Sequence, residues 1–475
     1  MNNKISQHRI LNGGKISRQK APRHFARQAS IWQPKVFLKT FGCQMNKYDS
    51  EVMKSLLLKD GYTFTDNWQE ADVILVNTCS VRQHAENKVY SYLGEWGEYK
   101  QELKPNLIIG ICGCMAQKEG INLLNKIPYL NLVCGTYSIP RIHEFVRDLL
   151  KTGGRRIETS EDYEGFPPPV YEAKESKISA WVAIMKGCNN YCAYCVVPYV
   201  RGREISRSVE EIENEVKELA RKGIKEVTLL GQNVNSYENR KPKTENQSSF
   251  AHLLKRINDI DSIERIRFTT SHPKDMSMAT IEAVRDLPKV CEHIHLALQS
   301  GSNKILKLMN RKYTREQYQE LVNRIIATIP DVSIMTDIMV GFPTETEDDF
   351  MDTYNLVKEI EFDASYMFKY SPRPGTKAAE TEDDVPEETK KERLNKLLSL
   401  QKRIAQKRNE KLIGKEVEIL VEGYASKGKN KYFGKTRNFK SVSFQSDKDL
   451  IGKLVKVKIV EVRGGLLDGV WELII

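Results

Sequence analysis

Three cysteines stand close together in the stretch MKGCNNYCAYCVVPYVRGREISR, at Cys188, Cys192 and Cys195. Thiolates are ligands for zinc and for iron-sulfur clusters, and three cysteines at such short spacings rarely arise by chance. Structural zinc requires four closed ligands, usually in paired Cys or Cys/His sets, and neither residue type recurs soon after Cys195. A four-iron cubane held by three thiolates keeps one iron free for a small molecule. The trio therefore favours a cluster with one open iron.

A second set of cysteines lies in the first part of the chain. Cys43, Cys79 and Cys114 each come just after an expected strand, in KVFLKTFGC, ADVILVNTCSV and LIIGICGCMAQ, and helical patterns separate these strands. Alternating strands and helices predict a parallel sheet, and the carboxyl ends of its strands form one edge. We therefore expect the three thiols to converge. Cys112 would share a strand face with Cys114, so this pattern leaves open which of the two belongs to the group.

The alternation of strands and helices restarts after a polar linker. Strands are expected at WVAIMKG, KEVTLLGQN, RIRFTTSHP, HIHLALQSGS, SIMTDIMVGFP and ASYMFKYSPRPGT, with amphipathic helices between them. Six such units predict a partial (β/α)6 barrel whose chemistry belongs at the carboxyl ends of the strands. Cys188, Cys192 and Cys195 follow the first of these strands, which is where an active site is expected.

Polar residues and glycines at the ends of these strands suit the close approach of a ligand. They are Gly231, Gln232, Asn233, Ser300, Ser302, Asp337 and Gly341. The alternative is that they are plain turn residues. Arg201, Arg203 and Arg207 follow the three clustered cysteines and would pair with a phosphate or a carboxylate, or they belong to a basic surface.

The composition indicates a soluble multidomain protein. The chain has 475 residues and a mean hydropathy of -0.50, and its longest apolar runs are far shorter than the roughly 18 residues of a spanning helix. Residues 1–34 are basic, contain no Asp or Glu and lack the apolar stretch of a signal peptide. An odd number of cysteines, nine in all, argues against a disulfide framework. We expect a cytoplasmic protein.

The domain organisation follows from these patterns and from a Val-, Ile-, Gly- and Lys-rich tail, in which apolar and polar residues alternate between turn signals. Such a tail predicts a small antiparallel β-barrel. The expected parts are a disordered basic extension at 1–34, an α/β domain with a parallel sheet at 35–152, a linker at 153–178, the partial barrel at 179–411 and the antiparallel barrel at 412–475.

The charge of the protein points to a polyanionic partner, because the net charge is +11 with a pI near 9.0. The tail contains YASKGKNKYFGKTRNFK, which mixes cations with aromatic rings and has no acid. Cations for phosphates and rings for bases are the ingredients of single-stranded RNA binding, whereas a solvated hairpin is the alternative. The predicted RNA-binding residues are Lys427, Lys429, Lys431, Lys435, Arg437, Lys440, Tyr432 and Phe433.

The pattern C-x-x-x-C-x-aromatic-C, after the first strand of an α/β barrel, resembles the radical S-adenosylmethionine (SAM) superfamily. FGCQMNKYDSE, NTCSVR, GCMAQ, RGREISRS, LLGQNVNSY, IMVGFPTETEDDF and YSPRPGT occur in this order before the terminal barrel. Together they resemble the methylthiotransferase family, and most of all its branch that acts on isopentenyladenosine in tRNA. The resemblance covers residues 35–475, and the terminal barrel would then be TRAM-like.

The resemblance implies two 4Fe-4S clusters. Cys188, Cys192 and Cys195 would ligate the cluster that binds SAM, with Tyr194 beside the nucleoside. Cys43, Cys79 and Cys114 would ligate an auxiliary cluster, with Cys114 preferred to Cys112 because GCMAQ matches the family pattern. The implied SAM contacts are Gly231, Gln232, Asn233, Ser300, Ser302, Asp337, Gly341 and Arg203.

The resemblance also implies a reaction. One SAM would donate a methyl group to sulfur carried on the auxiliary cluster, and a second would yield a 5'-deoxyadenosyl radical. The product would carry a methylthio group on carbon 2 of N6-isopentenyladenosine at position 37 of tRNA. An aromatic C–H has no leaving group and no acidic proton, so the cofactors must bring the chemistry and no acid/base residue is expected. The implied partners are a tRNA anticodon stem-loop, an external electron donor and a sulfur source, for a monomer away from membranes.

Two alternatives remain open on the sequence. Another branch of the same family would act on threonylcarbamoyl-adenosine in tRNA or on an aspartate of a ribosomal protein, although the basic, aromatic tail favours RNA over protein. The other alternative is an RNA-binding module without enzymatic activity that contains structural zinc.

Overall fold

The computed structural model describes residues 33–80, 83–162, 165, 167–169, 171–237, 249–425 and 430–471. The predicted extension at 1–34 lies outside the described residues except for its last two. The chain divides into two compact units, one made of residues 1–175 with 199–202 and the other of residues 176–198 with 203–475. No helix in the part of the chain that the structure describes is long and apolar enough to cross a membrane.

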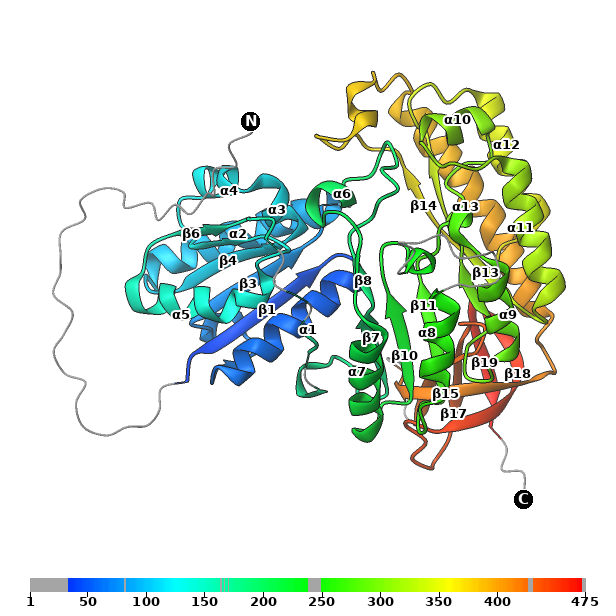
Figure 1. The fold of residues 1–475 in the computed structure, drawn as a ribbon, viewed down its shortest axis with the longest axis horizontal. Coiled ribbons are helices and arrows are strands. Elements are labelled where there is room, and N and C mark those ends of the chain that lie inside the picture. The colour runs from blue at the N-terminus through cyan, green and yellow to red at the C-terminus, as the bar shows by residue number, and fades with distance from the viewer. Residues whose placement is uncertain are drawn as a thin grey trace. The chain divides into compact units, whose positions relative to one another are not determined.

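The first unit contains the predicted parallel sheet, with six strands in the order β2-β1-β3-β4-β5-β6. Both central strands are buried along their whole length, as parallel strands are when helices cover both faces. The strands are β1 (Lys35–Phe41), β2 (Thr63–Phe64), β3 (Val73–Thr78), β4 (Ile108–Gly113), β5 (Leu132–Cys134) and β6 (Arg156–Glu158), and the helices are α1 (Gln44–Lys59), α2 (Gln83–Glu102), α3 (Cys114–Glu119), α4 (Ile121–Lys126) and α5 (Ile142–Thr152) (Figure 1).

The boundary of this unit differs from the one expected. Strand β6 pairs in parallel with β5, so it adds a strand to the sheet from within the segment expected to be a linker. A further short piece, residues 199–202, also belongs to this unit, although it follows the three clustered cysteines in the chain. It overlaps the end of α6 (Val197–Val200).

The second unit contains the six predicted βα strands, as two three-stranded parallel sheets in the orders β7-β10-β11 and β12-β13-β14. Only single bridges, such as Ile266 with Val290 and Ser271 with Leu296, join β11 to the region of β12. The strands are β7 (Ser179–Ala183), β10 (Glu226–Leu230), β11 (Arg265–Thr269), β12 (His293–His295), β13 (Ser333–Val340) and β14 (Ala364–Lys369), and a short hairpin consists of β8 (Met185–Lys186) and β9 (Ile205–Ser206).

The helices of the second unit begin at local sequence signals. Ser208, Thr314 and Thr346 each form a reciprocal capping box with the residue three positions later, which satisfies two backbone donors at the start of α7, α11 and α12. The helices are α7 (Val209–Arg221), α8 (Ser249–Asn258), α9 (Met278–Asp286), α10 (Asn303–Leu308), α11 (Arg315–Thr328), α12 (Glu347–Ile360) and α13 (Glu387–Glu410).

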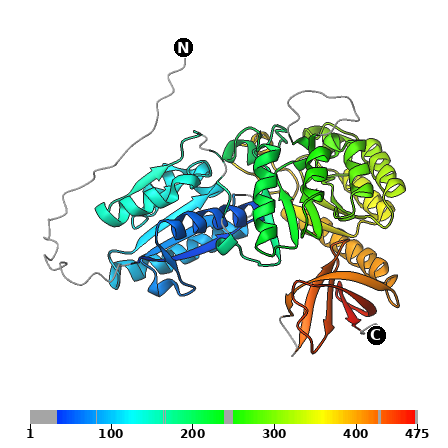
Figure 2. The ribbon, with the colours of Figure 1, turned by 60° about the horizontal axis from the view of Figure 1, so that its bottom comes forward.

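The C-terminal segment forms a closed five-stranded barrel in the order β15-β16-β17-β19-β18. Its strands are mixed and not all antiparallel as expected, because β17 and β19 pair in parallel. An odd number of strands cannot alternate in direction all the way around a closed barrel, so at least one parallel pair is unavoidable. The strands are β15 (Glu416–Tyr424), β16 (Lys431–Thr436), β17 (Ser441–Gln445), β18 (Leu454–Arg463) and β19 (Leu466–Val470), and Figure 2 shows them, orange to red, at one end of α13.

Buried arginines of β11 bind this barrel to the parallel strands. Arg267 donates to the main-chain oxygens of Thr436 and Arg437 at 2.7 and 2.6 Å, and its Nε donates to Glu226 at 2.9 Å. The side chains of Arg267 and Glu226 are only 2% and 5% exposed. Arg265 donates to the main-chain oxygen of Lys435 at 2.6 Å. Charge-assisted hydrogen bonds from these arginines of β11 to main-chain oxygens of the barrel therefore hold the barrel in place.

We expect Arg267→Ala to lower the free energy of unfolding by about 3 kcal/mol, because it leaves Glu226 buried without its partner. The midpoint of urea unfolding of the full chain measures this, and limited proteolysis should cut the C-terminal barrel faster. Arg285→Ala is the matched control, since Arg285 pairs with Asp286 on the surface and its loss should leave the midpoint unchanged. Equal midpoints for the two variants would contradict the expectation.

Candidate functional site

The structure brings the first cysteine trio together within the first unit. Cys43 follows β1 and precedes the first residue of α1, Cys79 follows β3, and Cys114 is the first residue of α3 directly after β4. The side chains of Cys43 and Cys79 hydrogen-bond to each other, and the charge of Cys43 acts on Cys114. The carboxyl ends of three neighbouring parallel strands therefore gather the three thiols, as the sequence predicts.

Two glycines make room for this trio. A Cβ on Gly42, whose φ is +141°, would lie 2.7 Å from the Cβ of Cys79, and one on Gly113, whose φ is +88°, would lie 2.2 Å from Oδ1 of Asn77. Asn77 in turn donates to the main-chain oxygen of Asn46 at 2.7 Å. Any side chain at either glycine would therefore displace the residues around the thiols.

A buried ion pair lies beside the same trio. Nη2 of Arg201 lies 2.7 Å from Oδ2 of Asp49, and the two side chains are 3% and 2% exposed. The hydrogen bond with Cys79 and the charge of Arg201 lower the pKa of Cys43 to about 6 against the opposing effect of burial. Burial raises the pKa of Cys114, and Arg201 opposes this rise.

The sequence predicts that the three arginines after the clustered cysteines pair with a phosphate or a carboxylate or belong to a basic surface, and two of them pair with carboxylates of the protein itself. Arg201 forms a buried ion pair with Asp49, and Arg207 donates to Glu215 at 2.5 Å in a second buried pair. Only Arg203 is exposed. A buried cation needs a buried anion, and the acids that supply these anions stand elsewhere in the chain.

Cys112 and Cys114 separate in the structure. Cys112 lies opposite Cys134 in the register of β4 and β5, and the two thiols hydrogen-bond to each other in a fully buried position. Cys114 is instead the member that lies near Cys43. Cys291 is also buried, as expected of a small hydrophobic side chain.

The second trio, Cys188, Cys192 and Cys195, lies in the second unit, between β8 and α6. The main-chain N–H of Cys195 donates to the main-chain oxygen of Cys192 at 2.9 Å. Burial, together with the charge of Cys192, raises the pKa of Cys188 to about 11 and that of Cys195 to about 12. The three thiols are therefore close neighbours, with Cys188 buried and Cys192 and Cys195 half-buried.

Arg311 is a residue of this site that the sequence did not reveal. Its Nη1 lies 3.3 Å from the sulfur of Cys192 and 3.5 Å from the hydroxyl of Tyr194, and its Nη2 donates to the main-chain oxygen of Ala297 at 2.7 Å. It is 4% exposed. Nothing in the stretch MNRKY marks this arginine, because Cys192 and Tyr194, which place it in the site, are more than a hundred positions away.

The donor chemistry of both trios fits iron-sulfur clusters. Each trio offers three thiols, and thiolates are the ligands that hold such clusters. No group of three His, Cys, Asp or Glu side chains would hold a single metal ion among the residues that the structure describes. A cubane makes a different demand, because each thiolate binds a separate iron atom.

Three of the predicted ligand contacts have structural partners instead. Asn233 donates to Asp275 at 2.7 Å. Ser302 caps α10 and donates to Asp349 at 2.6 Å, and Ser300 accepts from the main-chain N–H of Ser302 at 3.2 Å. All three side chains are buried. Their side chains thus support turns and a helix cap, and a contact with a ligand stays a prediction.

The other predicted strand-end residues remain available to a ligand. Oε1 of Gln232 is buried without a hydrogen-bond partner, and a buried acceptor of this kind calls for a donor. Asp337 is partly exposed, and its Oδ2 lies 3.1 Å from Nε2 of His295. Gly231 packs on Met185, 2.5 Å from any added Cβ, and Gly341 has a φ of +70°.

Three of the four predicted RNA-binding cations that the structure describes in the C-terminal barrel form ion pairs within the protein. Lys431 bonds to Asp468 at 2.7 Å, Arg437 to Glu292 at 2.7 Å and Lys440 to Asp363 at 2.9 Å. These three cations thus have acidic partners within the protein, and their contact with RNA stays a prediction. The segment itself has no acid, and its counter-charges come from other elements.

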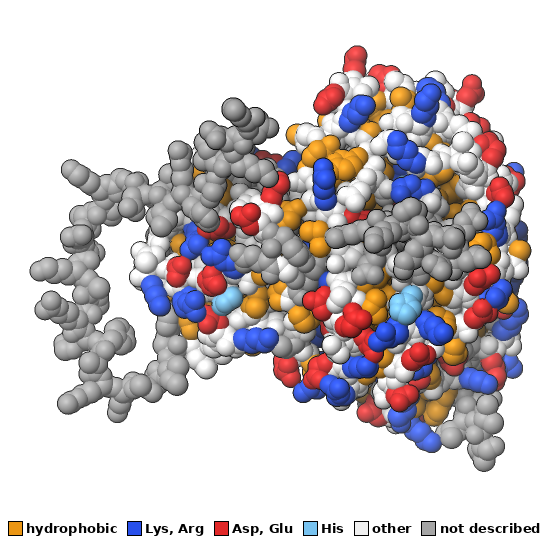
Figure 3. All heavy atoms as spheres, in the orientation of Figure 1, with side chains coloured by type: hydrophobic (Ala, Val, Ile, Leu, Met, Phe, Trp, Pro, Cys, Tyr) orange, Lys and Arg blue, Asp and Glu red, His pale blue; other side chains and the backbone are white. Residues whose placement is uncertain are grey.

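The remaining predicted RNA-binding residues either form no ion pair in the structure or lie outside the described residues. Lys435 is half-buried over the ring of Phe439, 3.7 Å from its centre. Tyr432 is buried and Phe433 is half-buried. Lys427 and Lys429 lie outside the described residues. On the face drawn in Figure 3, basic and acidic side chains are interspersed and form no broad basic surface.

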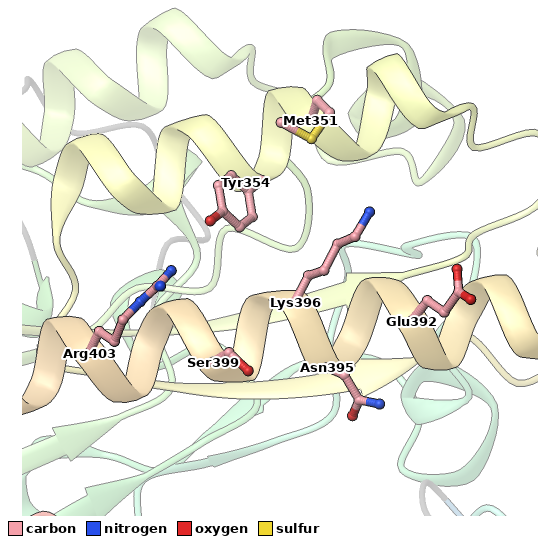
Figure 4. Close-up of a pocket in the computed structure, with 7 residues that line it drawn as sticks. All are labelled: Met351, Tyr354, Glu392, Asn395, Lys396, Ser399 and Arg403. Atoms are coloured by element: carbon pink, nitrogen blue, oxygen red, sulfur yellow. The ribbon is translucent and has the colours of Figure 1, made fainter.

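A separate groove of about 880 Å³ lies between α12 and α13 (Figure 4). None of its residues is a predicted site residue, and it contains no cysteine. It is lined by Met351, Tyr354, Glu392, Asn395, Lys396, Ser399 and Arg403.

Comparisons with known families agree with this geometry. Residues 182–357 match the radical SAM superfamily, residues 35–135 match the uncharacterized protein family UPF0004, and residues 410–470 match the TRAM domain. The chain is therefore a radical SAM protein with a C-terminal TRAM domain. This superfamily implies one 4Fe-4S cluster and SAM.

Curated relatives narrow the family, and by them the chain belongs to the methylthiotransferases named tRNA-2-methylthio-N(6)-dimethylallyladenosine synthases. The protein of that name from Thermoanaerobacter pseudethanolicus is 48% identical over 434 residues, which is 91% of each chain. The one from Clostridium botulinum strain Alaska E43 is 48% identical over 439 residues, covering 91% of this chain and 94% of that one.

Solved structures show the same fold at much lower identity. The radical S-adenosylmethionine methyltransferase TsrM from Kitasatospora setae, with cobalamin and a 4Fe-4S cluster bound, has a TM-score of 0.53 at 14% identity, covering 73% of this chain and 77% of that chain. At this identity the likeness shows the fold alone.

We expect metal-free protein treated with iodoacetamide at pH 7 to be alkylated at Cys43 in preference to Cys188 and Cys195. The thiolate is the nucleophile, and Cys43, with a pKa of about 6, is already ionised at this pH. Its labelling rate should rise between pH 5 and pH 7 and then level off. The other two thiols, with pKa values of about 11 and 12, should stay unlabelled until strongly alkaline pH. Peptide mass spectrometry measures the ratio, and equal labelling at pH 7 would contradict it.

Proposed function

We propose that this protein transfers a methylthio group to carbon 2 of N6-isopentenyladenosine at position 37 of tRNA. The observation that carries the proposal is the presence of two separate thiol trios, one in each family segment, at 35–135 and 182–357. Relatives with the synthase name support the substrate, because their similarity extends over 91% of the chain. A chain that only bound RNA would have no use for two such trios.

The residues of the chain have distinct roles in this proposal. Cys188, Cys192 and Cys195 hold the cluster that binds SAM, and Cys43, Cys79 and Cys114 hold the auxiliary cluster that carries sulfur. When bound, these groups supply a methyl group, sulfur and the radical that an unactivated C–H bond requires. The protein orients them and keeps water away, which suits trios whose cysteines are buried or half-buried.

The contacts to SAM are proposed for strand-end residues that offer an unsatisfied or partly exposed polar group, or a glycine backbone, to a ligand. Gln232 offers a buried acceptor without a partner, and Asp337 offers a partly exposed carboxylate. Gly231 and Gly341 allow close approach of the backbone. Tyr194 lies beside the nucleoside, and Arg203 is an exposed cation near the cysteine loop.

The proposed partners are the anticodon stem-loop of tRNA, an external electron donor and a sulfur source. The TRAM domain at 410–470 supports RNA as the partner. Of the predicted contacts in it, Lys435, Tyr432 and Phe433 are the described members without an ion pair in the structure, and Lys427 and Lys429 are proposed with them. We propose a cytoplasmic monomer.

Nucleosides from tRNA of a strain that lacks this gene should contain N6-isopentenyladenosine and no 2-methylthio derivative of it. Liquid chromatography with mass spectrometry measures both. Complementation with the parent chain should restore the derivative, and a Cys192→Ala variant should not. Unchanged 2-methylthio-isopentenyladenosine would reject the proposal. Loss of 2-methylthio-threonylcarbamoyl-adenosine instead would assign the protein to the other tRNA branch.

Anaerobically purified and reconstituted protein should contain about eight irons per chain, from two cubane clusters. Replacing Cys188, Cys192 and Cys195 together by Ala should lower this to about four, and so should replacing Cys43, Cys79 and Cys114. Iron and sulfide analysis with Mössbauer spectroscopy gives the count. Replacing Cys112 and Cys134 is the matched control and should leave it unchanged. Zinc without sulfide in the parent would overturn the cluster assignment.

A further inference from the structure

Arg201 occupies an unusual position for a surface-loop residue. It stands six positions after Cys195 in the chain, yet the short piece 199–202 belongs to the first unit. There its guanidinium is buried against α1, where Nη2 lies 2.7 Å from Oδ2 of Asp49. The loop that carries the SAM-cluster cysteines thus also supplies a cation to the auxiliary trio.

The pairing with Asp49 leaves one end of the guanidinium unused. Nη1 of Arg201 is buried and makes no hydrogen bond of ordinary geometry in the structure, and the guanidinium lies within reach of the Cys114 thiol. A buried donor without an acceptor is costly, and such a group in a native site calls for a ligand that completes it. The candidate acceptor must be anionic, because it faces a cation in a poorly hydrated setting.

The surroundings of Arg201 identify that acceptor. Its charge interacts with both Cys43 and Cys114, as well as with Asp49. Once Cys43, Cys79 and Cys114 are thiolates on iron, the sulfur atoms of the trio and of its cluster are the anions nearest to this cation. Hydrogen bonds to sulfur and local net charge are two of the factors that set the potential of an iron-sulfur cluster.

We propose that Arg201 is a positioning residue for the auxiliary cluster, whose free Nη1 donates to a cluster sulfur while Asp49 fixes the orientation of the guanidinium. This inference rests on the proposed function, which supplies the auxiliary cluster. The pair then sets the potential of the one-electron couple. Arg201 raises that potential, because its charge and its hydrogen bond stabilise the more negative, reduced cluster. Asp49 lowers it through its own negative charge.

The two members of the pair therefore have opposite effects, which a purely structural salt bridge would not produce. Arg201→Gln removes the cation and should shift the potential to more negative values, by at least a tenfold change in the reduction equilibrium, or about 59 mV for one electron. Asp49→Asn keeps an acceptor for Arg201 and removes the anion, so it should shift the potential to more positive values.

The test uses the full chain with Cys188, Cys192 and Cys195 replaced by Ala, so that only the auxiliary cluster remains. The chain is reconstituted with iron and sulfide without oxygen, and a redox titration followed by electron paramagnetic resonance gives the potential. Arg147→Gln is the matched control, because it removes the same charge from the same unit at an exposed pair with Asp60. It should leave the potential unchanged.

The outcomes separate the inference from the proposed function. If the triple-Ala chain binds no cluster before any change at Arg201, the auxiliary cluster itself is refuted. If it binds one, equal potentials in the parent and Arg201→Gln, or shifts of the same sign in Arg201→Gln and Asp49→Asn, overturn the role of Arg201. Should Arg201→Gln fail to hold the cluster, Asp49→Asn decides alone, with a positive shift in favour and no shift against.

Discussion

Parallel strands deliver the residues that follow them to one edge of a sheet, and the first cysteine trio depends on this constraint. Cys43, Cys79 and Cys114 are 36 and 35 positions apart in the sequence, yet each follows one of the adjacent strands β1, β3 and β4. No local motif could bring them together. The second trio does not depend on the order of strands in a sheet, because its members lie within eight residues of one another and one loop can hold them. One site is thus made by topology and the other by local spacing.

Each trio has one buried arginine, and the two arginines are held differently. Arg311 approaches Cys192 at 3.3 Å, and its other contacts are neutral oxygens of Ala297 and Tyr313, so it brings a full positive charge to the SAM-cluster site. Arg201 is paired with Asp49, so the auxiliary site receives no net charge from the pair. Since nearby charge alters the stability of a reduced cluster, this contrast gives the two sites different electrostatic surroundings within one chain.

The sequence predicts the strands, the order of the parts and the two cysteine groups, because each rests on a local pattern. It does not predict which cations are free. Arg437 and Lys440 lie in a stretch without acids, but their partners Glu292 and Asp363 are 145 and 77 positions away. The basic stretch faces the strands of the same unit through the backbone bonds of Arg265 and Arg267. Some of the cations that the sequence predicts to bind RNA therefore form ion pairs that hold the barrel in place.

The sequence also does not predict which polar residues at strand ends contact a ligand. A ligand contact and a structural support use identical residue types there, because both require a short side chain that can hydrogen-bond near a turn. Ser302 and Asn233 have carboxylate partners, the buried Asp349 and the half-buried Asp275, whereas Gln232 has a buried acceptor with none. Only the partner distinguishes the two cases. A buried polar atom left unsatisfied beside thiols, as in Arg201, is therefore better evidence of a function than the type of residue that carries it.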